Sequence, residues 1–132
     1  MPDPTTVWMV HKDVGRAGVR GDIMLAADRL IFRPEIRGAK PDTLGETVIP
    51  LAGVEKVRRS PATPVLELHL SVQGLPPVVL FYFVRPPDPY SSGMPNPRSA
   101  ALTYLASSNA LYEEEVATWA RAIGAAHRAR GA

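Results

Sequence analysis

Residues 65–72 alternate strictly between apolar and polar side chains, and this pattern constrains the fold more than any other feature of the chain. The apolar positions are Leu66, Leu68, Leu70 and Val72, and Glu67, His69 and Ser71 lie between them. In an extended strand, successive side chains point to opposite faces, so a period of two separates a buried face from a wet one. The segment is therefore predicted to be a half-buried strand of a sheet.

Six further segments have the length and composition of strands. They are residues 5–12, 20–26, 29–33, 46–51, 54–60 and 78–84. Ala27-Asp28 is the predicted turn of a hairpin, because an aspartate side chain can bond nearby backbone amides. Pro50 suits a strand end, since proline cannot donate to a sheet ladder. Residues 78–84 are apolar on both faces, so we expect both faces to be covered.

An amphipathic helix is predicted at residues 110–128. Its apolar positions recur at spacings of three and four and form one stripe: Tyr112, Val116, Trp119, Ile123 and Ala126. Residues 85–97 precede it with five prolines and a Ser-Ser-Gly, which excludes regular structure there. Asn96-Pro97 then suits the start of a short helix over residues 98–106. Ser107-Ser108-Asn109 is predicted to break that helix and to cap the next one.

Most of the chain resembles a known family. The quoted residues are Gly21-Asp22-Ile23-Met24-Leu25, Arg29-Leu30-Ile31-Phe32 and Ile49-Pro50-Leu51, followed by an apolar strand and the helix around Trp119. This succession is similar to the pleckstrin-homology-like superfamily, and most closely to its GRAM-type branch. The resemblance covers nearly the whole chain, except for residues 85–108, an insertion that the simplest members lack.

The resemblance implies a mainly β fold with a C-terminal helix. In that fold an open seven-stranded antiparallel barrel or sandwich is capped by the amphipathic helix, here with an extra loop and short helix before it. Residues 1–132 would form a single domain, as the length also favours. Trp119 matches the tryptophan often found on the helix that plugs the barrel, and its stripe partners Tyr112, Val116 and Ile123 would share that role. The resemblance also implies a binding platform, not a catalyst.

Composition excludes several classes of protein. The chain has no cysteine, so disulfides and thiolate chemistry are excluded, and its net charge of +2 comes without the dense basic run of a nucleic-acid binder. No apolar run approaches the length of about 20 residues that spans a bilayer. Met1-Pro2-Asp3-Pro4 lacks the features of a signal peptide, so we expect a cytoplasmic protein.

The residues that commonly perform catalysis or bind metals show no productive pattern. His11, His69 and His127 lack metal-ligand spacing, and no Gly-x-Ser-x-Gly motif is present. The consecutive Glu113, Glu114 and Glu115 are typical of a solvated helix start that complements the helix dipole. We therefore expect no enzymatic activity, no metal and no cofactor.

Anionic-lipid or phosphoinositide binding is one function that the resemblance suggests. Lipid-binding members carry a lysine at the end of the first strand and basic residues at the start of the second, where this chain has Lys12, Arg16 and Arg20. The usual basic pair separated by one position is missing, and the neighbouring loop adds Arg37 and Lys40 beside acidic residues. Peripheral binding to the inner face of a membrane is therefore the alternative hypothesis.

Protein binding, including self-association, is the function that we favour from the sequence. The proline-rich segment carries Tyr90 and Met94, and exposed aromatic and methionine side chains are enriched at interfaces. The resembled superfamily also accepts peptides along a sheet edge beside the plug helix, by strand addition. A small apolar ligand inside the barrel is a third hypothesis, although we expect side chains such as Leu68 and Phe81 to fill that space.

Overall fold

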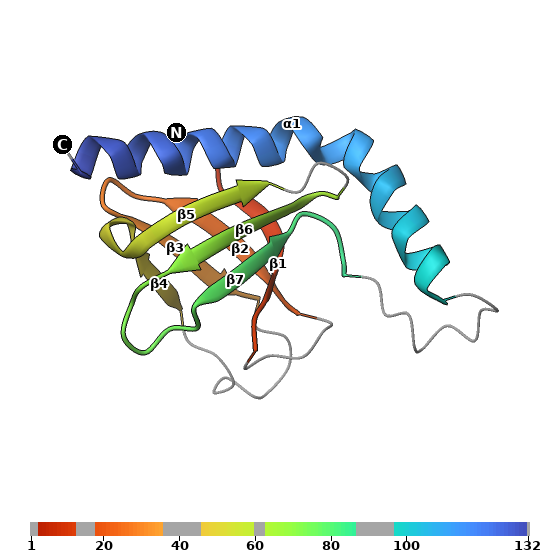
Figure 1. Ribbon diagram of the computed structural model, residues 1–132, viewed down its shortest axis with the longest axis horizontal. Helices are drawn as coiled ribbons and strands as arrows, with labels where there is room; N and C mark the ends of the chain where they lie inside the picture. Colours follow the sequence, from red (N-terminus) through yellow and green to blue (C-terminus); the bar gives the residue numbers. More distant parts are fainter. Residues whose placement is uncertain (1–2, 13–17, 36–45, 60–62, 87–96, 132) are drawn as a thin grey trace.

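A seven-stranded antiparallel sheet and one long C-terminal helix make up the architecture of the protein (Figure 1). The computed structural model describes residues 3–12, 18–35, 46–59, 63–86 and 97–131. The strands are β1 (Thr5–Val10), β2 (Val19–Leu25), β3 (Arg29–Pro34), β4 (Thr47–Pro50), β5 (Val54–Arg59), β6 (Val65–Leu70) and β7 (Val78–Tyr82). A 3-10 turn, η1 (Leu51–Gly53), joins β4 to β5, and the helix is α1 (Pro97–Gly131). The predicted mainly β fold with a C-terminal helix is confirmed.

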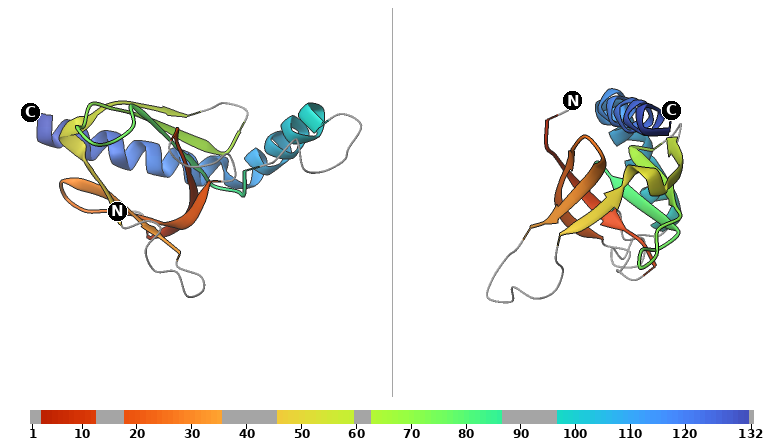
Figure 2. Two further views of the ribbon diagram at one scale, coloured as in Figure 1. Left: turned by 90° about the horizontal axis from the view of Figure 1, so that it is seen from below. Right: turned by 90° about the vertical axis from the view of Figure 1, so that its left-hand side faces the viewer.

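The order of strands in the sheet is β4-β3-β2-β1-β7-β6-β5, and each pair is antiparallel. The sheet curls around the core, and α1 lies across its open side (Figure 2). β4 and β5 do not pair with each other, so the sheet remains open. Among the described residues, the outer edges of β4 and β5 therefore have no strand partner.

Two local predictions agree with the observed backbone. In β6, Leu66 and Leu68 are fully buried, whereas Glu67 and His69 are only half-buried, as their alternation predicted. The β2–β3 hairpin turns at Ala27-Asp28, where the backbone N–H of Ala26 donates to the carbonyl oxygen of Arg29 at 2.8 Å. Strand β7 differs in one respect: its inner face is buried, but its outer face is only half-covered.

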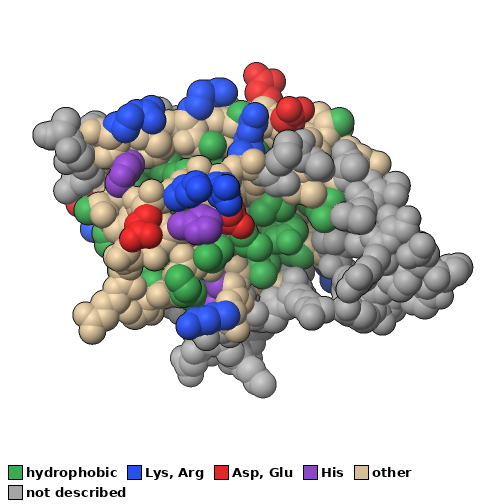
Figure 3. Space-filling model, viewed as in Figure 1, with side chains coloured by type: hydrophobic (Ala, Val, Ile, Leu, Met, Phe, Trp, Pro, Cys, Tyr) green, Lys and Arg blue, Asp and Glu red, His purple; other side chains and the backbone are tan. Residues whose placement is uncertain are grey.

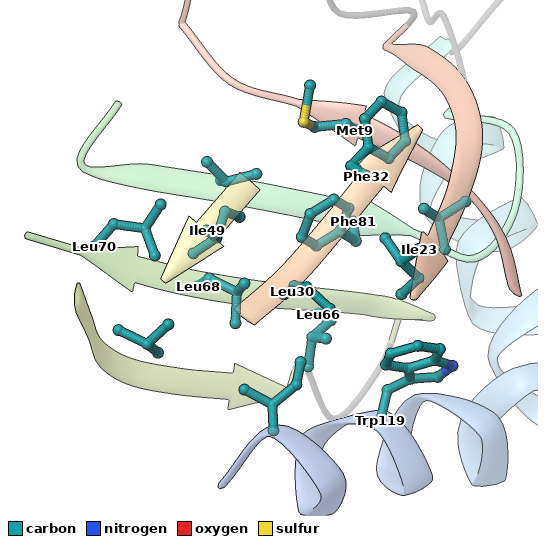
Figure 4. Packing of buried hydrophobic residues seen from close by; sticks show 14 of the residues in the cluster. Met9, Ile23, Leu30, Phe32, Ile49, Leu66, Leu68, Leu70, Phe81 and Trp119 are labelled. Carbon is teal, nitrogen blue, oxygen red and sulfur yellow. The ribbon is translucent and has the colours of Figure 1, made fainter. Parts of the chain in front are cut away.

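The core lies inside the curled sheet, between its two halves (Figure 4). Its largest fully buried side chains are Trp119, Phe32, Phe81, Met9, Ile23, Leu30, Ile49, Leu51, Leu66, Leu68, Ile123 and Val7. The rings of Phe32 and Phe81 have centroids 6.1 Å apart and are tilted by 39°, within the range that aromatic pairs prefer. Side chains from β3 and β7 thus meet across the interior, as expected of Phe81.

Helix α1 is one continuous helix, and the predicted break at Ser107-Ser108-Asn109 is wrong. The predicted short helix over residues 98–106 forms its first turns, which are inclined to the remainder in Figure 1. Serine and asparagine cost only a few tenths of a kcal/mol each inside a helix, and serine pairs are among the sites where a continuous helix bends. As predicted, proline occupies the first helical position.

The second part of α1 covers the open side of the sheet, mainly over β5 and η1. Val116, Trp119 and Ile123 are buried in the core, and Tyr112 is partly buried at its margin. The indole Nε1 of Trp119 donates to the hydroxyl oxygen of Thr5 in β1 at 3.1 Å. This hydrogen bond fixes the helix to the first strand of the sheet.

We expect Trp119→Ala to lower the free energy of unfolding by about 3–5 kcal/mol, because it removes the largest fully buried side chain and leaves a cavity. Chemical denaturation of the purified variant measures this loss. Leu111→Ala is the matched control on the same helix, since Leu111 is 80% exposed and its truncation should change the stability by less than about 0.5 kcal/mol. Equal stabilities of the two variants would contradict the packing described here.

Gly21 marks a position in β2 where two strands leave no room for a side chain. A Cβ there would collide with the carbonyl oxygen of Arg33 and lie 2.7 Å from Cζ of Phe32. We expect Gly21→Ala to destabilise the fold by about 1–3 kcal/mol through overpacking. Gly124→Ala in α1 is the control, and should stabilise the fold by up to about 1 kcal/mol because alanine is the better helix former. Thermal unfolding of both variants distinguishes the two environments.

Candidate functional site: a groove between β5 and α1

Only part of the predicted lipid-binding cluster falls within the described residues. Lys12 is exposed just after β1, whereas Arg16, Arg37 and Lys40 lie outside the described residues. The Arg20 guanidinium has Nε 3.3 Å from Oε2 of Glu35 and stacks over the Trp8 ring with Cζ 5.6 Å from its centroid. Arg20 is thus neutralised and held by its own neighbours.

The predicted protein-interface residues Tyr90 and Met94 also lie outside the described residues. The nearest described part of that insertion is the start of α1. There the Tyr104 hydroxyl donates to the carbonyl oxygen of Arg85 at 3.1 Å and ties the helix to the end of the sheet.

His69 and His127 lie in separate places. His69 has Nε2 2.8 Å from Oε2 of Glu67 on the outer face of β6. His127 donates from Nδ1 to the carbonyl oxygen of Leu51 at 2.7 Å, so that α1 is tethered to η1. Among the described residues no group of three or more histidine, aspartate or glutamate side chains is arranged to hold a metal ion. Nor does any helix in this part of the chain have the length and apolar character needed to cross a membrane.

Within the described part of the chain, strand β5 forms one edge of the sheet and pairs only with β6. Within the described residues, the backbone N–H of Val54 donates to the carbonyl oxygen of Leu51 in η1, and no backbone hydrogen bond joins residues 55–59 to a segment other than β6. A β-bulge between Val54 and Lys56 interrupts the pairing, which is regular again from Lys56 to Arg59. An unpaired strand edge is a row of backbone donors and acceptors that a further strand can use.

A groove of about 300 Å³ runs along this edge, between β5 and α1. It is lined by Val54, Glu55, Lys56, Val57, Arg59, Ala120, Gly124, His127 and Arg128. Neighbouring residues of a strand point to opposite faces of the sheet. Residues 54–57 follow one another in β5 and all line the groove, so the groove follows the strand backbone and not one face of the sheet. The lining residues of α1 are Ala120, Gly124, His127 and Arg128. Gly124 lies three or four positions from each of the other three, so the four residues form one strip of the helix surface.

Two of the four helix residues that line the groove are small. Ala120 and Gly124 stand one turn apart, and a Cβ added at Gly124 would meet only the flexible Arg128 side chain, with its Nη1 at 3.3 Å. Small side chains on the helix leave space beside the β5 backbone. The groove therefore has the shape to take an extended chain.

The groove carries more positive than negative charge. Lys56, Arg59 and Arg128 line it together with a single carboxylate, that of Glu55. The three basic side chains and Glu55 have no ion-pair partner within the described part of the chain. Such a surface favours a segment with acidic side chains.

Sequence reasoning did not identify the groove, although it anticipated binding at a sheet edge beside the helix. One signal was present: Gly124 interrupts a helix of good formers at a cost of about 1 kcal/mol relative to alanine, which points to a packing or functional reason. Which strand forms the edge beside it depends on the strand order, which has no signature in the sequence.

Comparison with models of known protein families and with curated proteins gives no match. The similarity to the pleckstrin-homology-like superfamily thus rests on the residue pattern alone, and functional inference rests on the geometry of the chain itself.

Proposed function

We propose that the protein is a non-enzymatic, cytoplasmic binding module of the pleckstrin-homology-like kind, which takes up an extended segment of another protein along β5. One observation supports this most directly: the groove follows the unpaired edge of β5 and has small residues on its opposite wall. A groove of that form suits a polypeptide backbone better than a compact ligand.

Strand addition supplies the binding energy in this proposal. An added strand lies about 4.8 Å from β5, within hydrogen-bonding distance of its free N–H and C=O groups. These backbone bonds are independent of the bound sequence, while alternate side chains provide specificity. One set would point toward Ala120 and Gly124, where little space remains for bulky groups.

Charge adds selectivity. Acidic side chains of the bound segment would lie near Lys56, Arg59 and Arg128, whose long side chains reach over the groove. Pairs at the exposed rim of an interface contribute little affinity but accelerate association at low salt. We therefore expect binding that weakens as the ionic strength rises, but is not abolished.

Gly124→Leu should weaken peptide binding without loss of the fold. The leucine fills the groove, whereas the nearest atoms it meets belong to the movable Arg128 side chain. Peptides selected from a displayed random library on the parent protein provide ligands, and their dissociation constants are measured for parent and variant by fluorescence anisotropy. We expect at least a tenfold loss, the scale of roughly 1.4 kcal/mol.

Ala125→Leu is the matched control, since it adds the same side chain at the next position of α1, which is exposed. Its affinity for the peptides should equal that of the parent. Amide chemical shifts in β5 should move on peptide addition, and its outward N–H groups should gain protection from hydrogen exchange. Selected peptides that bind Gly124→Leu as tightly as the parent, or that shift amides remote from β5, would refute the proposal.

A further inference from the structure

The outer face of β6 and β7 carries an apolar patch (Figure 3). The cross-strand pairs Val65–Tyr82, Glu67–Leu80 and His69–Val78 alternate with the core residues of the same strands, so they point outward. Hydrophobic side chains gather at this place in Figure 3, beside lysine or arginine side chains. The patch lies on the outer face of the sheet, whereas the β5 groove lies between β5 and α1, and Arg59 at the end of β5 borders both.

Part of this patch is hollowed into a pocket of about 480 Å³. Its lining is Arg58, Arg59, Thr63, Val65, Glu67, Leu80, Tyr82 and Leu105. Val65, Leu80 and Tyr82 form an apolar floor on the strands, and Leu105 of α1 adds an apolar wall. Partial burial raises the pKa of Tyr82, so its hydroxyl remains protonated and able to donate.

The rim of the pocket is basic. Glu67 is engaged by His69 at 2.8 Å, whereas Arg58 and Arg59 have no ion-pair partner within the described residues. An apolar pocket with two free guanidinium groups at its edge matches an apolar side chain flanked by carboxylates.

The same chain presents such a group on α1. Leu111 is 80% exposed, the most exposed of the large hydrophobic side chains in the described part of the chain. Glu114 and Glu115 follow at i+3 and i+4, so they flank Leu111 on one face of the helix. Both glutamates are exposed, and neither has an ion-pair partner within the described residues.

Leu111 does not reach the pocket of its own chain. The pocket wall contains Leu105, and Leu111 lies roughly 9 Å further along the helix axis and about 120° around it. Its high exposure agrees with this separation. The two complementary surfaces can therefore meet only between two molecules.

We propose that the protein self-associates by inserting Leu111 of one copy into the Arg58/Arg59 pocket of a second copy, with Glu114 and Glu115 facing the two arginines. Because each copy carries both surfaces, a two-fold arrangement makes the contact twice and closes the assembly as a dimer. The interface shares only Arg59 with the lining of the β5 groove, so a dimer retains two peptide grooves.

Sedimentation equilibrium of the full chain at low salt measures this association. The parent should show a concentration-dependent monomer–dimer equilibrium that weakens with salt. Leu111→Ser should weaken dimerisation at least about tenfold, since two buried leucines are lost per dimer. Leu111 is exposed in the monomer, so circular dichroism at a concentration where the parent is monomeric should show the same fold and thermal stability.

A charge swap gives the sharper result. The variants Arg58→Glu/Arg59→Glu and Glu114→Arg/Glu115→Arg should each be monomeric, because both contacts bring like charges together. When the two are mixed, every contact again joins arginine to glutamate, and the heterodimer should form with affinity near that of the parent. Glu113→Arg is the control: it alters the same acidic run on another helix face, and should leave dimerisation unchanged.

A parent chain that stays monomeric at the concentration of an NMR sample would overturn the proposal, as would a mixture of the two charge-swap variants that stays monomeric. Dimerisation that persists in Leu111→Ser would do the same. Gly124→Leu should dimerise like the parent, so the result is independent of peptide binding in the β5 groove.

Discussion

The burial of Trp119 is the interaction on which the rest of the structure depends. A curled sheet whose edge strands do not pair leaves its apolar inner face open on one side, where Ile23, Leu30 and Leu66 would meet water (Figure 4). The indole is fully buried there beside Val116 and Ile123 of the same helix, and its Nε1 donates to the Thr5 hydroxyl, 114 residues earlier in the chain. The largest side chain thus joins the last element to the first, and its polar atom is satisfied, as a buried donor requires.

The open sheet that needs this helix also provides the surfaces proposed for binding. In a closed barrel every strand edge is paired, so no edge remains for strand addition. Here α1 lies along β5 with Ala120 and Gly124 facing the strand, and His127 anchors its end to η1 at 2.7 Å. The other edge is less suited, since β4 has only four residues and ends at Pro50, which has no N–H to donate.

Helix α1 has three different surfaces along its length. One stripe, centred on Trp119, packs in the core, and a strip of small residues borders the groove. A third face presents Leu111 with two carboxylates to solvent. A helix that only covered the sheet would have no need of an exposed leucine or an internal glycine. The exposed leucine and the internal glycine both depart from a simple amphipathic pattern, and each lies at one of the surfaces proposed for interaction.

The sequence by itself determined the elements. The alternation of β6, the hairpin turn at Ala27-Asp28 and the stripe through Trp119 predicted strands, turn and buried helix face correctly, because each depends on side chains close together in the chain. The break expected at Ser107-Ser108-Asn109 did not occur, since three weak helix formers cost little within a continuous helix. Only the tertiary structure decided where the surfaces meet. β5 becomes an edge strand because β4, the strand before it in the sequence, pairs with β3 instead, while β7 lies between β6 and β1. Strand order arises from contacts between distant segments, so no local pattern shows that Gly124 borders a strand edge or that Arg58 and Leu105 share one pocket.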